Sequence, residues 1–336
     1  MGGAADAVPR HRSRQRLSRR SGAELKRAAR IASWLVAALA LAWFVRQFAA
    51  HLGAVPRPEL SWTVAAALAA SVLAYVILTL VDGAAWVLLL RGCGAPLGLR
   101  DGLLVFCIAQ FGKYVPGNVA QHLGRVWLAR EHGVPAAPVV FTIAVETLTA
   151  VLVGLLLIAV SLASMPDPAD AALRWRMLAF AAPAVAGVAV LLHLLNRYRP
   201  WPLRRLLGDQ PFPLPGSGAF ALYVASHAAS FLLMSVATDL VARFVFGVAD
   251  PHFALLPGVL AMGWVSGFVV PGAPAGLGVR EAVLLAGLGP LLGPGPAAGV
   301  TLATRLLGSV ADALLFGGGL LARGLWARPK CIEGSP

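Results

Sequence analysis

Residues 111–125 read FGKYVPGNVAQHLGR, and residues 268–280 read FVVPGAPAGLGVR. Each stretch places a Phe before a Pro-Gly pair and ends in Leu-Gly followed by an Arg. The two Pro-Gly pairs lie 155 positions apart, and each interrupts a long apolar part of the chain. Helix-breaking residues and a cation that recur within apolar sequence are typical of the site of a transporter built from an inverted repeat.

The composition of the chain is that of a helical membrane protein. Of its 336 residues, 58% are hydrophobic and only 13% are charged, whereas a soluble domain of this size needs a charged surface. The apolar runs are continuous rather than alternating, which favours helices over the strands of a β-barrel. The sequence therefore predicts an all-α, polytopic membrane protein.

The net charge of +13 is distributed as in a membrane protein rather than a nucleic-acid-binding protein. Nine of the 28 Lys and Arg residues lie in the first thirty positions, and most others lie in short loops between apolar runs. Cations in such positions hold loops on the cytoplasmic side, next to anionic lipid. Residues 1–30 are therefore expected to form a disordered cytoplasmic arm that sets the topology and can bind anionic lipid. No nucleic-acid partner is expected.

Apolar length and loop charge together predict about six full spans in the plasma membrane. An anchor is preferred to a cleaved signal peptide for the first of them, because no convincing cleavage site follows its apolar core. The Lys and Arg distribution places both termini in the cytoplasm. The predicted spans are residues 31–50, 60–90, 137–163, 177–195, 219–247 and 297–322.

The two Pro-Gly stretches are expected to form re-entrant helical hairpins. Residues 102–112 are too short to cross a core of about 30 Å, and cations flank this segment, so its hairpin opens to the cytoplasm. Residues 253–270 and 281–293 flank the second pair without cations at their ends, so this hairpin opens outside. Its first arm is long enough to span instead, which would raise the total to as many as eight spans.

The membrane domain, residues 31–326, then divides into halves of similar layout. Residues 31–163 and 177–322 each contain two spans, a hairpin and a third span, and they begin on opposite sides of the membrane. This is an inverted repeat, with a two-fold axis in the membrane plane. The alternative is chance similarity among Ala- and Leu-rich helices. Residues 327–336 are expected to form a short cytoplasmic tail.

Ionisable side chains within the spans are candidates for function, because each costs roughly 2.5–3.5 kcal/mol to insert. Asp82 is one of them. Under the repeat, Glu146 corresponds to Arg305, and the two are expected to approach each other near mid-membrane. Asp239 and Arg243, an i,i+4 pair, are expected to neutralise each other. The candidates for headgroup binding and translocation are Lys113, Pro116, Gly117, Arg125, Glu146, Gly276, Gly278, Arg280, Glu281, Arg305 and Asp312.

Some of these candidates also have a purely structural interpretation, and the sequence lacks common catalytic motifs. Arg125 could merely extend to the membrane interface, and the Pro-Gly pairs could be simple kinks. The chain has no GxxxxGKS/T loop, HExxH motif or GxSxG elbow, and its three cysteines form no CxxC pair. The sequence therefore predicts no enzyme activity, no metal and no cofactor.

The two motifs resemble the signature stretches of the lysylphosphatidylglycerol synthase transmembrane-domain family, which are flippase-like membrane proteins. KYVPGNVAQHLGR and PAGLGVREA carry the resemblance, which covers residues 30–325. The second is the more specific, although Ala275 stands where the family more often has Gly. In bifunctional members this unit moves aminoacylated phosphatidylglycerol between leaflets, and a C-terminal cytosolic domain makes the lipid. The sequence ends six residues after Lys330, so the flippase-like unit is expected here without the synthase domain.

The resemblance implies a flippase-like transporter that moves a phospholipid or a lipid-linked polar headgroup between leaflets, with a separate lipid-modifying synthase as a partner. Arg280 and Arg125 would contact lipid phosphate from opposite sides. Glu146, Glu281 and Asp312 would hold these cations or bind a cationic headgroup. The alternatives are a membrane-embedded enzyme or accessory subunit of lipid or polyprenyl-lipid glycosyl or aminoacyl transfer, and a scaffold for a partner synthase.

Cysteine labelling tests the predicted topology. In a chain whose native cysteines are replaced, a single Cys at position 167 is expected to react with a membrane-impermeant maleimide in intact cells, because its loop is acidic. A Cys at position 204 is expected to react only after permeabilisation, since its loop carries four Arg residues. Labelling at 204 in intact cells would contradict the topology.

Overall fold

The computed structural model describes residues 39, 41–42, 45–46, 49–50, 52–95, 97–115, 119–165, 175–176, 179, 215–269 and 274–326. The basic arm, most of the predicted spans 31–50 and 177–195, and the tail lie outside the described residues. So do the candidate site residues Pro116 and Gly117.

The described part of the chain is all-helical, with eight α-helices and no strand, which confirms the predicted fold class. Four helices are long and apolar enough to cross a membrane. They coincide with four of the six predicted spans and are α2 (Trp62–Gly92), α5 (Ala136–Ala163), α8 (Ser217–Leu240) and α11 (Pro294–Trp326). A π-helical turn, Val241–Val245, extends α8.

Composition and capping explain why these segments form long helices with lipid-facing sides. The hydroxyl of Ser61 accepts a hydrogen bond from the Val64 amide and caps the start of α2, while Arg91 lies in its last turn, where a cation is favoured. The outer faces expose apolar side chains one turn apart, such as Leu152, Leu156 and Val160 on α5. Such an exposed apolar face suits hydrocarbon rather than water as solvent.

In each half of the chain, two short helices that pack against each other flank the Pro-Gly pair. In the first half these are α3 (Leu99–Gln110) and α4 (Ala120–Glu131), with the 3-10 turn Phe111–Tyr114 after α3. In the second half they are α9 (Leu256–Val269) and α10 (Val279–Leu292), with the turn Pro274–Gly276 before α10. Helices of 12 and 14 residues reach about 18 and 21 Å, less than a bilayer core of about 30 Å.

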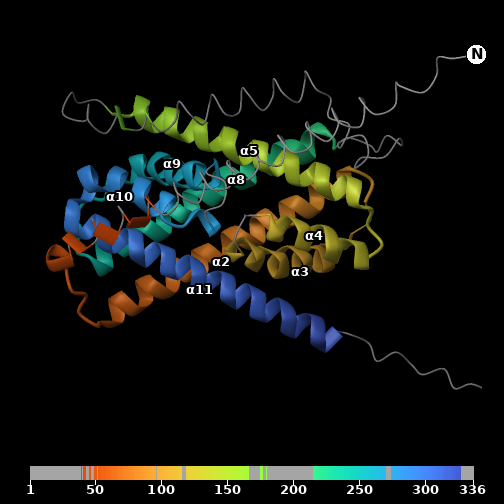
Figure 1. Ribbon diagram of the computed structural model, residues 1–336, viewed down its shortest axis with the longest axis horizontal. Helices are drawn as coiled ribbons and strands as arrows, with labels where there is room; N and C mark the ends of the chain where they lie inside the picture. Colours follow the sequence, from red (N-terminus) through yellow and green to blue (C-terminus); the bar gives the residue numbers. More distant parts are fainter. Residues whose placement is uncertain are drawn as a thin grey trace, which may run out of the picture.

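The two halves repeat the same order of elements, a long helix, two short helices and a second long helix. Helices α2 and α8 pack against each other, α3 packs on α11 of the other half, and α9 packs reciprocally on α5. Figure 1 shows α3 and α4 toward one end of the molecule and α9 and α10 toward the other. This exchange of contacts is compatible with a two-fold repeat. The inverted repeat, the direction of each half across the membrane and the re-entry of the hairpins stay predictions.

Close packing within the second hairpin predicts a position-specific effect on stability. A Cβ at Gly267 would lie 3.1 Å from the Cβ of Arg280 and 3.2 Å from the Cα of Gly276, neither of which is a flexible side-chain end. Gly267→Val is therefore expected to destabilise the protein by about 1–3 kcal/mol, as overpacking does. The matched control is Gly318→Val on α11, where a Cβ meets nothing within 4 Å. Equal melting temperatures in detergent for both variants would contradict this packing.

Candidate functional site

A cavity of about 240 Å³ lies between the two hairpins and the long helices, and all eight described α-helices contribute to its lining. The structure therefore gathers residues that are far apart in sequence. Of the sequence-predicted site residues, Gly278 does not line the cavity. The predicted residues that do line it are Lys113, Arg125, Glu146, Gly276, Arg280, Glu281, Arg305 and Asp312.

The first charged contact in the cavity joins α4 to α5. Both terminal nitrogens of Arg125 donate to the carboxylate of Glu146, the Nη2–Oε1 distance being 3.0 Å. The guanidinium carbon lies 4.0 Å from the ring centroid of Phe106, and Arg125 is only 1% exposed. Arg125 is thus a buried, tightly held cation and not a side chain that extends to the interface. Its two-point contact leaves it little freedom to bind another anion.

A second contact ties the turn of the first hairpin to α11. The ammonium of Lys113 lies 2.7 Å from Asp312, and the hydroxyl of Tyr114 donates to the same carboxylate at 2.6 Å. The Tyr114 hydroxyl oxygen also lies 3.2 Å from the hydroxyl oxygen of Ser309, one turn earlier on α11. Asp312 therefore has a cation and a hydroxyl donor, both from the segment that follows α3.

A third contact ties the second hairpin to the same helix. Arg305 lies 3.4 Å from Glu281 and donates to the carbonyl of Ala275 at 3.0 Å. Glu281 also accepts from the amide of Gly278 at 2.7 Å, so it caps the start of α10, where Gly278 has a φ of +85°. The Nη2 of Arg305 is buried without a hydrogen-bond partner in the described residues.

These contacts show that the predicted approach of Glu146 to Arg305 is wrong. Glu146 pairs with Arg125 of its own half, and Arg305 pairs with Glu281 of its own half. A repeat predicts which helices occupy equivalent positions. It does not predict which side chains form ion pairs, because each side chain binds the partner that the neighbouring hairpin brings within reach. The predicted Asp239–Arg243 pair is confirmed, with contacts of 2.9 and 3.0 Å, and it does not line the cavity.

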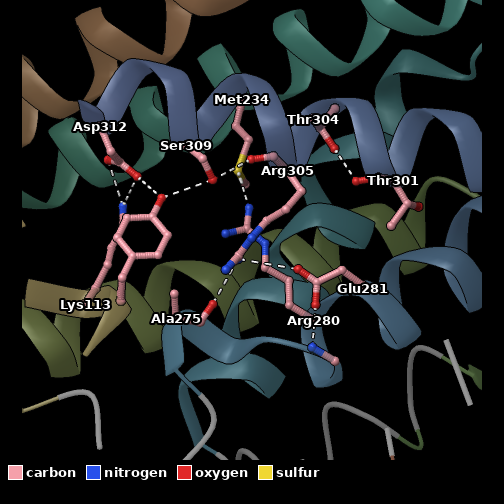
Figure 2. Close-up of polar contacts among 12 residues, drawn as sticks. Lys113, Met234, Ala275, Arg280, Glu281, Thr301, Thr304, Arg305, Ser309 and Asp312 are labelled. Carbon is pink, nitrogen blue, oxygen red and sulfur yellow. Dashed lines mark hydrogen bonds and ion pairs between the residues drawn. The ribbon is translucent and has the colours of Figure 1, made fainter. Parts of the chain in front are cut away.

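Arg280 differs from the other cations of the cavity. Its Nη2 donates to the sulfur of Met234 at 3.3 Å, and within the described ranges no carboxylate lies within ion-pair distance of it. It lies beside the guanidinium of Arg305, a like charge (Figure 2). The second hairpin thus places in the cavity a cation, Arg280, that has no anionic partner among the described residues.

A second group of polar side chains in the cavity contains Asp82, which the sequence indicated as a candidate, and two residues that it did not indicate, His227 and Ser230. Asp82 of α2 accepts a hydrogen bond from Ser230 of α8 at 2.9 Å, and His227 lies 3.9 Å from the same carboxylate. The sequence feature that could have indicated this group is the pair His227 and Ser230, two polar residues three positions apart within the apolar helix α8. Among the residues that the structure describes, no group of three His, Cys, Asp or Glu side chains is arranged to hold a metal ion.

Comparison with known proteins gives one family match. A model of the lysylphosphatidylglycerol synthase TM region matches residues 30–315, a range that contains seven of the eight described α-helices and most of α11. A search of curated proteins found no match.

The Arg125–Glu146 contact predicts a large loss of stability when only one partner is removed. Glu146→Gln leaves a buried guanidinium without its counter-ion, which costs about 3–5 kcal/mol. The double variant Arg125→Met with Glu146→Gln is expected to recover much of that loss. The control is Arg323→Gln, which breaks an exposed pair with Glu131 and is expected to cost less than about 1 kcal/mol. The changes in the free energy of unfolding are compared in a double-mutant cycle. If the change in the double variant equals the sum of the changes in the two single variants, the pairing is refuted.

Proposed function

Because the chain belongs to the lysylphosphatidylglycerol synthase transmembrane-region family, we propose that its cavity carries the phosphate-bearing headgroup of a membrane lipid between the two leaflets. The observation that carries the proposal is Arg280, a cavity-lining cation whose contact in the described structure is a thioether rather than a carboxylate. The cargo is a phospholipid or another lipid-linked headgroup with a phosphate.

The charges of the cavity support Arg280 as the phosphate ligand. Lys113, Arg125 and Arg305 each have a carboxylate, so their positive charges are already offset. A guanidinium without a carboxylate matches the paired oxygens of a phosphate through parallel N–H donors. The free Nη2 of Arg305 is a second donor next to it. An anion between these two guanidiniums would also relieve their mutual repulsion.

Helix α11 supports the separation of headgroup and tails. One face presents Arg305, Ser309 and Asp312 to the cavity. The other face exposes Leu306, Val310 and Leu314, which are 48–57% exposed. A lipid next to α11 could therefore hold its headgroup against the polar face while its tails stay in hydrocarbon. This division is what lowers the barrier for moving a polar group across a bilayer.

The hairpins support a path between leaflets. In the proposed arrangement they re-enter from opposite sides of the plasma membrane as halves of an inverted repeat, with both termini in the cytoplasm. The contacts Lys113–Asp312 and Arg305–Glu281 join the two hairpins to one helix, seven residues apart. Breaking one while keeping the other would open the cavity to one side at a time. This mechanism needs no covalent chemistry, so the proposed protein is a transporter and not an enzyme.

A flipping assay tests the role of Arg280. In proteoliposomes with fluorescent phosphatidylglycerol and a membrane-impermeant quencher, Arg280→Ala is expected to lower the flipping rate at least about tenfold, since it removes a charged hydrogen-bond donor. Arg280→Lys is expected to retain part of the rate, because it keeps the charge but loses the paired donors. Glu281→Gln is expected to slow flipping by releasing Arg305.

The matched control is Arg243→Ala, which removes an arginine outside the cavity. Full activity of both Arg280→Ala and Glu281→Gln would sink the proposal. Activity that requires a co-reconstituted lipid-modifying synthase would instead favour an accessory subunit for that partner.

A further inference from the structure

We propose that Asp82 takes up a proton when a phosphate-bearing headgroup occupies the cavity, so that the anionic headgroup and the proton cross the membrane together. The proposal rests on the proposed function for the identity of the cargo. The protonation itself is a property of the protein and can be measured without any transport.

Asp82 is a carboxylate with no Lys or Arg partner in the described part of the chain. The other three cavity carboxylates, Glu146, Glu281 and Asp312, each lie within 3.4 Å of a Lys or Arg nitrogen. Asp82 instead accepts from the hydroxyl of Ser230 at 2.9 Å. Of the four cavity carboxylates, Asp82 is therefore the one that can gain a proton without breaking an ion pair with Lys or Arg, and its neutral form costs less to bury than the ion.

The groups around Asp82 do not supply a full counter-ion. His227 lies 3.9 Å away, and its Nδ1 is 3.3 Å from the carbonyl of Tyr223, which can only accept. A hydrogen on that nitrogen would be donated to the Tyr223 carbonyl, so His227 gives Asp82 no hydrogen bond. From α5, Glu146 adds a negative charge, and from α4, Arg125 is already held by Glu146 at two points. The remaining neighbours are the phenol of Tyr223 on α8 and, lining the same cavity, His122 on α4.

Proton uptake by Asp82 would keep the cavity neutral when an anionic headgroup binds. With neutral histidines, the described cavity holds four cations, Lys113, Arg125, Arg280 and Arg305, and four carboxylates. A bound phosphodiester adds one negative charge, and a buried uncompensated charge is strongly unfavourable. A proton delivered by a hydronium ion of the solvent, which becomes water, forms an O–H bond on Asp82 and restores neutrality. Release of that proton on the far side, together with the headgroup, returns the cavity to its first state.

Helix α8 places the proton site next to the phosphate site. Ser230 contacts Asp82, and Met234, one turn further along the same face, contacts Arg280. Four residues of α-helix rise by about 6 Å. Occupancy of either site therefore changes the electrostatic field at the other, and linkage requires the effect to be reciprocal. The headgroup should raise proton affinity at Asp82, and a bound proton should tighten headgroup binding.

Infrared spectroscopy tests the site directly. The full chain in dodecyl maltoside, a detergent without phosphate, is titrated with acid while the C=O stretch of protonated carboxyl groups is followed. Part of that signal is expected to vanish in Asp82→Asn and to persist in the control Asp239→Asn, whose carboxylate is paired with Arg243. Adding short-chain phosphatidylglycerol is expected to move the midpoint of the Asp82 signal up by about one pH unit, which corresponds to about tenfold coupling.

Short-chain diacylglycerol, which lacks the phosphate, is expected to leave that midpoint unchanged. An identical titration signal in wild type and Asp82→Asn would overturn the proposal. So would a midpoint that phosphatidylglycerol does not move.

Proteoliposomes separate this inference from the proposed function. With a pH-sensitive dye inside, wild type is expected to bring protons inward together with fluorescent phosphatidylglycerol, and an inward proton gradient is expected to speed flipping. Flipping without proton movement, or driven instead by a Na⁺ gradient, overturns the proton proposal and leaves the proposed function standing. No flipping of phosphate-bearing lipid at all contradicts the proposed function, whereas the infrared titration still decides whether Asp82 binds a proton.

Discussion

The structure depends on one constraint, that a charge buried among apolar helices must find a partner. Three ion pairs meet this constraint, and each joins two elements of the fold: α4 to α5, the first hairpin to α11, and the second hairpin to α11. These contacts therefore fix the hairpins against the long helices. Arg280 and Asp82 line the same cavity without a partner of this kind in the described residues, and they are the proposed sites for an anion and a proton.

Helix α11 is the element that both hairpins share. Arg305 and Asp312 lie on one face of it, two turns apart, and each is held by a different hairpin. Its opposite face is exposed and apolar. A single helix thus contacts both hairpins while another of its faces stays exposed and apolar, an arrangement that suits the proposed movement of an amphipathic lipid.

Much of the fold could be predicted from the sequence, because apolar length alone defines long helices and the Pro-Gly pairs with their flanking glycines define the breaks. Most of the candidate residues that line the cavity could be named from the sequence, because ionisable side chains are conspicuous in apolar sequence. The pairing could not be predicted, as Glu146 shows: periodicity gives the face of a helix but not which neighbour it meets. The contact of Asp82 with Ser230 and His227 was missed because it joins helices 148 positions apart, and serine in a helix carries no signal of its own.

Arg280 is the proposed binding site for an anionic group of the cargo. An experimental structure of the chain in a phosphatidylglycerol bilayer would test this role. We predict a lipid phosphate within hydrogen-bond distance of the Arg280 guanidinium, with Arg125 still held by Glu146. A phosphate bound elsewhere in the protein, with Arg280 paired to a carboxylate of the chain, would contradict it.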